Sequence, residues 1–323
     1  MSGMDLSLAN IEKANRIIDP VFRNSPQFSD EQLNAALGHR ILLKVETANP
    51  IRSFKGRGMS FRAQSFTKGQ HAVCASAGNF GQAVGYTCRS RGIPVTVFVP
   101  EDVNPVKLKR MEAFGSTVSV GGADGDDAKR RARDFAKQGA GRIFIEDGED
   151  PAISEGAGTI AIELLAAGTI DVAVIPVGDG ALITGMALWL REHSPRTRIV
   201  GVCPQGAPAM ERSWKAGGKV LSVAPDTIAD GLAIRTPIAR SLERIRALVD
   251  DIVLVDDAAL RRAMQAAAAA LGLLLEPAGA AGLAAIAGGG IAGERIATVL
   301  TGSNVHPKLA AELLAAEAKR LAN

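Results

Sequence analysis

A lysine in a short polar loop is the first residue whose chemistry stands out. Lys55 lies in the stretch NPIRSFKGRGMSF, residues 49–61. A neutral lysine amine can attack a carbonyl carbon or take a proton. A lone lysine in a loop is nevertheless more often a solvated surface charge, because about one residue in four of a soluble domain is charged. The local sequence therefore leaves the role of Lys55 open.

A turn of small residues offers a first anion site. The stretch SAGNFGQAVGY, residues 76–86, follows a β-branched run, and we expect a helix to begin near Gly81. Free backbone N–H groups at such a helix start can bind a carboxylate or a phosphate. Taken alone, this turn is equally compatible with ordinary tight packing.

A glycine-containing turn offers a second anion site. In GDGALITG, residues 178–185, two glycines allow close backbone approach and a helical pattern follows. A dinucleotide-binding turn is the competing interpretation, but Ile183 replaces its third glycine, and the next strand ends near Cys203 rather than at an acidic residue. A Walker-type loop requires Gly-Lys-Ser/Thr, which the sequence lacks.

Two more motifs follow apolar runs late in the chain. LLLEPAGAAG, residues 273–282, places Glu276 at an expected helix start, and TGSNV, residues 301–305, follows an expected strand. Because a helix dipole stabilises an acid in the first turn, we interpret Glu276 as a helix-start residue rather than a catalytic group. TGSNV adds a hydroxyl at Thr301.

The composition excludes several classes of protein. With a net charge of +3 and 4% aromatic residues, the chain has neither the basic run nor the stacking aromatics of a nucleic-acid-binding protein. Cys74, Cys88 and Cys203 are widely spaced and are interpreted as reduced core cysteines. Residues 1–18 lack an export signal, and a charge and a proline interrupt the apolar stretch 264–293. We therefore expect a cytoplasmic protein with no membrane partner.

The order of the elements predicts an α/β fold. Short β-branched runs alternate with helical patterns, which implies a mostly parallel sheet covered by helices on both faces. Ligands of such sheets bind beyond the carboxyl ends of the strands, which is where the candidate turns lie. The expected strands are ILLKVE, HAVCAS, PVTVFVP, STVSV, RIFIE, DVAVIPV, RIVGVCP, DIVLVD and RIATVLTG.

The ordered set of motifs resembles a known family. SFKGRG, SAGN, the glycine turn, EPAG and TGSN, together with TIADGLA at residues 227–233, resemble the fold type II pyridoxal-phosphate enzymes, specifically the threonine/serine dehydratase and serine racemase group. The resemblance runs from about residue 12 to about residue 310. It implies two open, twisted, mostly parallel sheets flanked by helices, with the active site between two domains.

The resemblance also implies where the domains divide. A large domain that binds pyridoxal 5'-phosphate would comprise residues 1–66 and 149–323, and a small domain, residues 67–148, would carry the asparagine loop. A homodimer is implied as well.

The resemblance assigns roles to single residues. Lys55 would bond covalently to the cofactor aldehyde and act as the base, with Phe54 beside the cofactor ring. Asn79 would face the pyridine hydroxyl, Thr301 the pyridine nitrogen, and Gly231 would line the pocket through its carbonyl. The loop that binds the substrate carboxylate would comprise Ser76, Ala77, Gly78 and Asn79. The phosphate would be bound by Gly178, Asp179, Gly180, Ala181 and Leu182.

The implied activity is that of an ammonia-lyase. It would convert a β-hydroxy-α-amino acid such as L-threonine or L-serine to a 2-oxo acid and ammonia. The nearest alternative is a β- or γ-replacement enzyme resembling threonine synthase or cysteine synthase. An amino-acid racemase and an inactive ligand-binding paralogue are the remaining alternatives.

Several residues depart from the pattern of the group. Serine racemases have the pattern SSGN at this turn and use its second serine as a proton donor. Ala77 occupies that position here, so elimination is favoured over racemisation. Phe80 replaces the usual histidine, and Asp179 enters the phosphate loop, where we expect it to cap the following helix. No carboxylate occurs in residues 203–209, so no magnesium or calcium is expected there.

Two arginines near Lys55 are left out of the predicted site. We interpret Arg52 and Arg57 as solvated or salt-bridged neighbours rather than substrate contacts.

Overall fold

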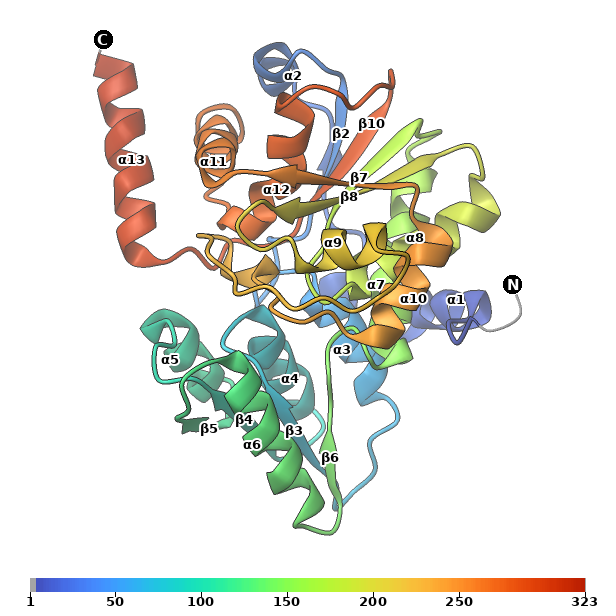
Figure 1. The fold of residues 1–323 in the computed structure, drawn as a ribbon, viewed down its shortest axis with the longest axis vertical. Coiled ribbons are helices and arrows are strands. Elements are labelled where there is room, and N and C mark those ends of the chain that lie inside the picture. The colour runs from blue at the N-terminus through green and yellow to red at the C-terminus, as the bar shows by residue number, and fades with distance from the viewer. Residues whose placement is uncertain (1–3, 323) are drawn as a thin grey trace.

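The fold contains two mainly parallel β-sheets flanked by helices (Figure 1). The computed structural model describes residues 4–322. The larger sheet has the order β1-β2-β10-β7-β8-β9, with β1 antiparallel to β2, and the smaller has the order β5-β4-β3-β6. The strands are β1 (Gln27–Phe28), β2 (Ile41–Val45), β3 (His71–Ala75), β4 (Val95–Val99), β5 (Thr117–Val120), β6 (Arg142–Phe144), β7 (Val172–Pro176), β8 (Arg198–Pro204), β9 (Asp251–Val255) and β10 (Ile296–Leu300).

Helices connect the strands in both sheets. Two short 3₁₀ helices span Pro20–Phe22 (η1) and Asp230–Leu232 (η2). The α-helices are α1 (Leu8–Ile17), α2 (Glu31–Leu37), α3 (Lys55–Ala63), α4 (Asn79–Arg89), α5 (Pro105–Ala113), α6 (Gly125–Lys137), α7 (Pro151–Ala166), α8 (Ala181–His193), α9 (Ala209–Lys215), α10 (Ala239–Leu248), α11 (Asp257–Leu271), α12 (Pro277–Ala287) and α13 (Pro307–Ala322).

Apolar cores lie on both faces of the larger sheet. One cluster combines side chains of α1, α7, α8 and α10, and the other combines those of α2, α11 and α12. Strands β7 and β10 are buried at all five positions, as parallel strands covered on both faces require. In Figure 1 the smaller sheet, with α4, α5 and α6, occupies the lower part of the molecule.

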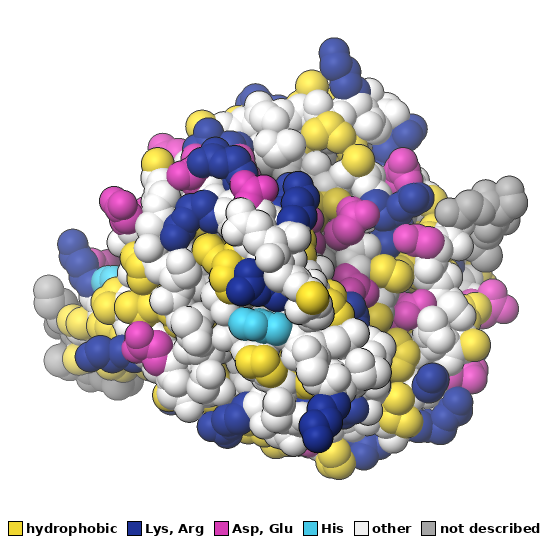
Figure 2. Space-filling model, turned by 90° about the horizontal axis from the view of Figure 1, so that it is seen from below, with side chains coloured by type: hydrophobic (Ala, Val, Ile, Leu, Met, Phe, Trp, Pro, Cys, Tyr) yellow, Lys and Arg dark blue, Asp and Glu magenta, His cyan; other side chains and the backbone are white. Residues whose placement is uncertain are grey.

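On the side of the smaller sheet, the surface that the structure describes carries charged side chains of both signs (Figure 2). Seen from below in Figure 2, Lys and Arg side chains alternate with Asp and Glu and with scattered hydrophobic side chains. None of the helices described between residues 4 and 322 is long and apolar enough to cross a membrane.

The predicted fold class is confirmed, and each of the nine predicted strands is present. The prediction missed β1, because two residues carry no periodic pattern. It was also wrong in two local details: Lys55 begins α3 rather than lying in a loop, and α4 begins at Asn79 rather than near Gly81. The strands of the smaller sheet lie between residues 71 and 144, while the domain boundaries themselves stay a prediction.

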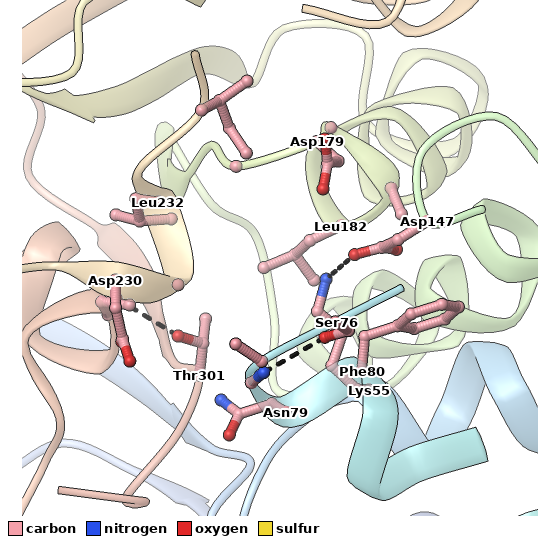
Figure 3. Close-up of a pocket in the computed structure, with 18 of the residues that line it drawn as sticks. Lys55, Ser76, Asn79, Phe80, Asp147, Asp179, Leu182, Asp230, Leu232 and Thr301 are labelled. Carbon is pink, nitrogen blue, oxygen red and sulfur yellow. Dashed lines mark hydrogen bonds and ion pairs between the residues drawn. The ribbon is translucent and has the colours of Figure 1, made fainter. Parts of the chain in front are cut away.

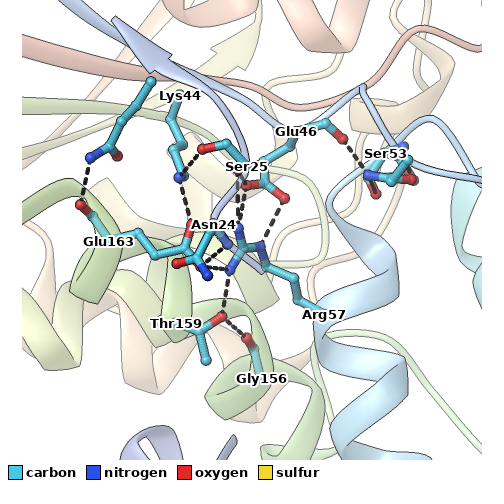
Figure 4. Close-up of polar contacts among 11 residues, drawn as sticks. Asn24, Ser25, Lys44, Glu46, Ser53, Arg57, Gly156, Thr159 and Glu163 are labelled. Atoms are coloured by element: carbon cyan, nitrogen blue, oxygen red, sulfur yellow. Dashed lines mark hydrogen bonds and ion pairs between the residues drawn. The ribbon is translucent and has the colours of Figure 1, made fainter. Parts of the chain in front are cut away.

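A buried ion cluster fixes the helix that begins with Lys55 (Figure 4). The fully buried guanidinium of Arg57 donates to both oxygens of Glu46 at 2.8 Å and to those of Glu163 at 2.7 and 2.8 Å. Lys44 lies 2.5 Å from Glu163. Arg57 therefore ties α3 to the end of β2 and to α7, and the interpretation of this residue as salt-bridged is confirmed.

Replacing Arg57 by methionine should strongly destabilise the fold. The change leaves two buried carboxylates without their main partner, so the free energy of unfolding should fall by about 3–5 kcal/mol in urea denaturation at neutral pH. Arg261→Met is the control, because Arg261 and Glu312 form an exposed pair, and it should cost less than about 1 kcal/mol. Equal losses in the two variants would contradict this account.

The same cluster should make stability depend on pH. Although burial opposes ionisation, hydrogen bonds from Arg57 and Lys44 lower the pKa of Glu163 to about 2. A lowered carboxyl pKa stabilises the fold above the unfolded pKa, and this contribution is lost as the pH falls toward 2. The stability advantage of the wild type over Glu163→Gln should therefore shrink by about 1 kcal/mol from about pH 5 to about pH 3.5. An advantage that stays constant in denaturant titrations over this range would refute the assignment.

Candidate functional site

One pocket collects every residue that the sequence predicted for the site. It lies where loops after β3, β6, β7 and β10 meet the starts of α3, α4, α8 and α12 (Figure 3). The predicted residues that line it are Phe54, Lys55, Ser76, Ala77, Gly78, Asn79, Gly178, Asp179, Gly180, Ala181, Leu182, Gly231 and Thr301. Phe80 also lines it. The structure thus brings these residues together, while their individual roles stay predictions.

Four helix N-termini open into this pocket without a cap. Within residues 4–322, no side chain caps α3, α4, α8 or α12, and the first or second residue of each of these helices lines the pocket. Ser, Asp or Asn side chains cap α1, α2, α5, α6, α7 and α11, whereas α9 and α10 also lack a cap from the described side chains but begin outside the pocket. Uncapped N-termini present free N–H groups and the positive end of the helix dipole. The pocket is therefore suited to anionic groups.

Lys55 points into the pocket between an aromatic ring and a carboxylate. Its Nζ lies 4.6 Å from the centroid of the Phe54 ring and pairs with the Asp147 carboxylate. The Lys55 side chain is 17% exposed, so it remains reachable from the cavity. A reachable primary amine at the positive end of a helix suits covalent bonding to an anionic carbonyl compound.

Glu276 lies at the start of α12, as predicted, and it also lines the pocket and contacts a predicted site residue. It does occupy the N-cap position of α12, but its side chain is buried and accepts a 2.5 Å hydrogen bond from Asn79 Nδ2. Asn304 Nδ2 donates to Asn79 Oδ1 at 2.8 Å. Both polar atoms of the Asn79 amide are therefore hydrogen-bonded, one to Glu276 and the other to Asn304, and these two bonds hold the side chain in one orientation.

A network of charged side chains connects α5 to Glu276, the partner of Asn79. Lys107 Nζ lies 2.5 Å from the Asp230 carboxylate and 4.0 Å from that of Glu276. Burial raises the pKa of Glu276. Burial opposes the charged form of Lys107 as well, yet the two carboxylates raise its pKa. Lys107 therefore links the smaller sheet to η2 and α12 at the edge of the pocket.

Asp179 does not cap α8, so that prediction was wrong. The N-cap residue is Gly180, with φ of +95°, and the Asp179 carboxylate lies 3.9 Å from Lys129 Nζ. Burial raises the pKa of Asp179 to about 6. Its carbonyl accepts a 2.5 Å hydrogen bond from Ser241 Oγ. Asp179 comes one residue before the N-cap, and none of the described side chains caps α8, so the first amides of this helix stay open to the pocket.

Asp147 and Lys129 were missed by reasoning from sequence. Asp147 comes three residues after the end of β6, and Lys129 lies within α6; both line the pocket. The rule that ligands bind beyond the carboxyl ends of parallel strands was a signal for Asp147. No local signal marks Lys129, whose place depends on how α6 packs.

The cysteines form no part of the pocket. Cys74, Cys88 and Cys203 are buried and free within the described chain, which confirms them as core residues. Burial raises the pKa of the Cys88 and Cys203 thiols to about 12, so neither is a ready nucleophile. Among residues 4–322, no three or more His, Cys, Asp or Glu side chains gather to hold a metal ion.

Comparison with known proteins defines the family. Residues 18–302 match the model of the pyridoxal-phosphate dependent enzymes. The L-threonine ammonia-lyase of Geobacter sulfurreducens is 33% identical over 307 residues, covering 92% of this chain and 75% of that one. The catabolic L-threonine dehydratase of Staphylococcus aureus (strain N315) is 30% identical over 311 residues, covering 93% and 89%.

Solved structures agree with these relatives. The threonine deaminase of T.th. superposes with a TM-score of 0.86 at 31% identity, covering 92% of this chain and 98% of that one. Maize serine racemase superposes with a TM-score of 0.89 at 26% identity, covering 99% and 100%. The chain belongs to the pyridoxal-phosphate dependent enzyme family, in its fold type II class. It is a lyase of the dehydratase group, and its cofactor is pyridoxal phosphate.

Two glycines of the pocket should respond differently to alanine. A Cβ on Gly180 would meet Ser241 Oγ at 2.0 Å, and φ of +95° strains any L residue. At Gly78, a Cβ meets none of the described atoms within 4 Å, and φ is −124°. Gly180→Ala should lower the free energy of unfolding by about 1–3 kcal/mol, whereas Gly78→Ala should change it by less than about 0.5 kcal/mol. Denaturant titration of both variants checks this, and equal stabilities would contradict it.

Proposed function

We propose that this enzyme is an ammonia-lyase that converts L-threonine or L-serine to the corresponding 2-oxo acid and ammonia. The observation that carries the proposal is the placement of Lys55 in one pocket with the uncapped N-termini of α4 and α8. The relatives named as threonine ammonia-lyase and threonine dehydratase support the choice of substrate.

The residues of the pocket fit the cofactor. The open amides at the start of α8 would hold its phosphate, because they are strong donors at the positive end of a helix. Lys55 would bond to its aldehyde, and Phe54 would lie beside its ring. Thr301 would offer a hydroxyl to the ring nitrogen, and Asn79 an amide to the ring hydroxyl. When bound, the cofactor supplies an aldehyde carbon and an electron-withdrawing ring.

The remaining residues bind the substrate and move its proton. The start of α4, residues 76–79, would hold the substrate carboxylate through backbone amides, since no side chain within residues 4–322 caps that helix. Lys55 Nζ, once displaced by the substrate amine, would be a neutral base that takes the α-proton. Thr301 carries no negative charge and would not keep the ring nitrogen protonated. An uncharged hydroxyl at this position would therefore suit the prompt loss of a β-hydroxyl from the substrate.

Ala77 favours elimination over racemisation. Its methyl group lines the pocket and cannot deliver a proton to the substrate. We further propose the two-domain division at residues 66 and 148, a cytoplasmic location and a homodimer. The resemblance to the dehydratase group supports the division and the dimer, and the three free cysteines are compatible with a reducing compartment.

The decisive experiment is a panel of β-hydroxy-α-amino acids incubated with the purified holoenzyme. Ammonium and 2-oxo acid should appear in equal amounts from L-threonine or L-serine without a second substrate. Lys55→Ala should lose the visible absorbance of the bound cofactor and the activity together, because the covalent attachment and the base are one residue. Lys68→Ala, at an exposed position outside the pocket, is the control and should keep both. Release of neither product from any member of the panel would overturn the proposal.

A further inference from the structure

Asp147 is a buried carboxylate with one oxygen lacking a partner. Its side chain is 9% exposed, and Oδ2 pairs with Lys55 Nζ. Oδ1 is buried and has no hydrogen-bond partner among the described residues. A buried polar atom without a donor is costly, so such atoms in native proteins usually await a ligand or water. Because Asp147 lines the pocket, the missing donor can come from a bound molecule.

Further acids stand beside Asp147 in the pocket wall, and Arg133 and Lys129 pair with these acids rather than with Asp147. Glu146 and Asp179 line the same pocket, and Lys129 lies 3.4 Å from the Glu146 carboxylate and 3.9 Å from that of Asp179. Within the part of the chain that the structure describes, the cation that pairs with Asp147 is Lys55. A donor or cation is therefore favoured next to Asp147, and a second anion is disfavoured.

The position of Asp147 relative to Lys55 indicates which part of a substrate it meets. Asp147 contacts Lys55 Nζ, and in the proposed reaction the substrate nitrogen would come close to the position of this amine. Figure 3 shows Asn79 and Asp147 on different sides of the Lys55 amine. With the substrate carboxylate held on the side of Asn79 and the α-hydrogen directed at the Lys55 amine, the remaining substituent, Cβ, would face Asp147. A heteroatom on Cβ lies three bonds from the nitrogen and one on Cγ lies four, both within reach of a carboxylate beside that nitrogen.

We propose that Asp147 is a specificity-determining residue whose free oxygen accepts a hydrogen bond from the β-substituent of the substrate. The inference rests on the proposed function and narrows its substrate class. The enzyme selects α-amino acids whose β-substituent donates a hydrogen bond or carries a positive charge, such as a hydroxyl, an amide or an ammonium group. It rejects those with a β-carboxylate, which would be an unpaired anion against Asp147.

The test compares two ligands of nearly equal shape. L-asparagine donates through its amide, whereas L-aspartate is an anion there. Their dissociation constants are measured from the change in cofactor absorbance on binding to the holoenzyme, so turnover is not needed. The wild type should bind L-asparagine at least about tenfold more tightly than L-aspartate, equivalent to about 1.4 kcal/mol. In Asp147→Asn this ratio should fall below about threefold, chiefly because the affinity for L-aspartate rises.

Matched variants separate specificity from a general structural effect. Glu149→Gln changes an exposed carboxylate two residues away, outside the pocket, and should keep the wild-type ratio. If Asp147→Asn fails to retain cofactor, the ratio of affinities is measured in Asp147→Ser, where it is also expected to fall below about threefold. An unchanged ratio in whichever variant retains cofactor, or a wild type that binds both ligands equally, would overturn the inference. Failure of the amino-acid panel would overturn the lyase function instead, since the binding ratio requires no product.

Discussion

Parallel strands joined by crossover helices impose the constraint on which this site depends. In each sheet the carboxyl ends of the parallel strands and the starts of the following helices face the same edge. Both edges meet at the pocket, so residues from loops after β3, β6, β7 and β10 become neighbours. The uncapped starts of four helices gather there, and their free amides and dipoles create a region that attracts anions.

The carboxylates of the pocket balance that positive region. Asp147 pairs with Lys55, Asp179 lies near Lys129, and Glu276 holds the amide of Asn79. Each is largely withdrawn from water and faces a cation or a donor, which is the condition under which a buried acid is tolerated. A pocket of this kind can hold a phosphate and a carboxylate at helix ends while it favours donors elsewhere. This charge pattern is the basis on which we infer that Asp147 selects among substrates.

Much of the fold and site could be predicted from sequence because their signals are local. β-branched runs separated by helical patterns predicted every strand of three or more residues in the described chain. Among the described strands, the prediction missed only the two-residue strand β1. The motifs around Lys55, Asn79 and Thr301 predicted residues that do line one pocket. The cap assigned to Asp179 was wrong because the N-cap position falls one residue later, at Gly180 with φ of +95°, and a sequence pattern does not show where the helix starts to within one residue.

The sequence by itself determined the order of reactive and anion-binding segments and the family to which they belong. Short-range patterns are sufficient for that, because helix starts, glycine turns and strand periodicity depend on neighbouring residues. Only the tertiary structure decided which acids enter the pocket. Lys55 and Asp147 are 92 residues apart, and Asn79 and Glu276 are 197 apart. Such contacts exist only when both sheets have packed, since no local rule fixes the distance between segments so far apart in the chain.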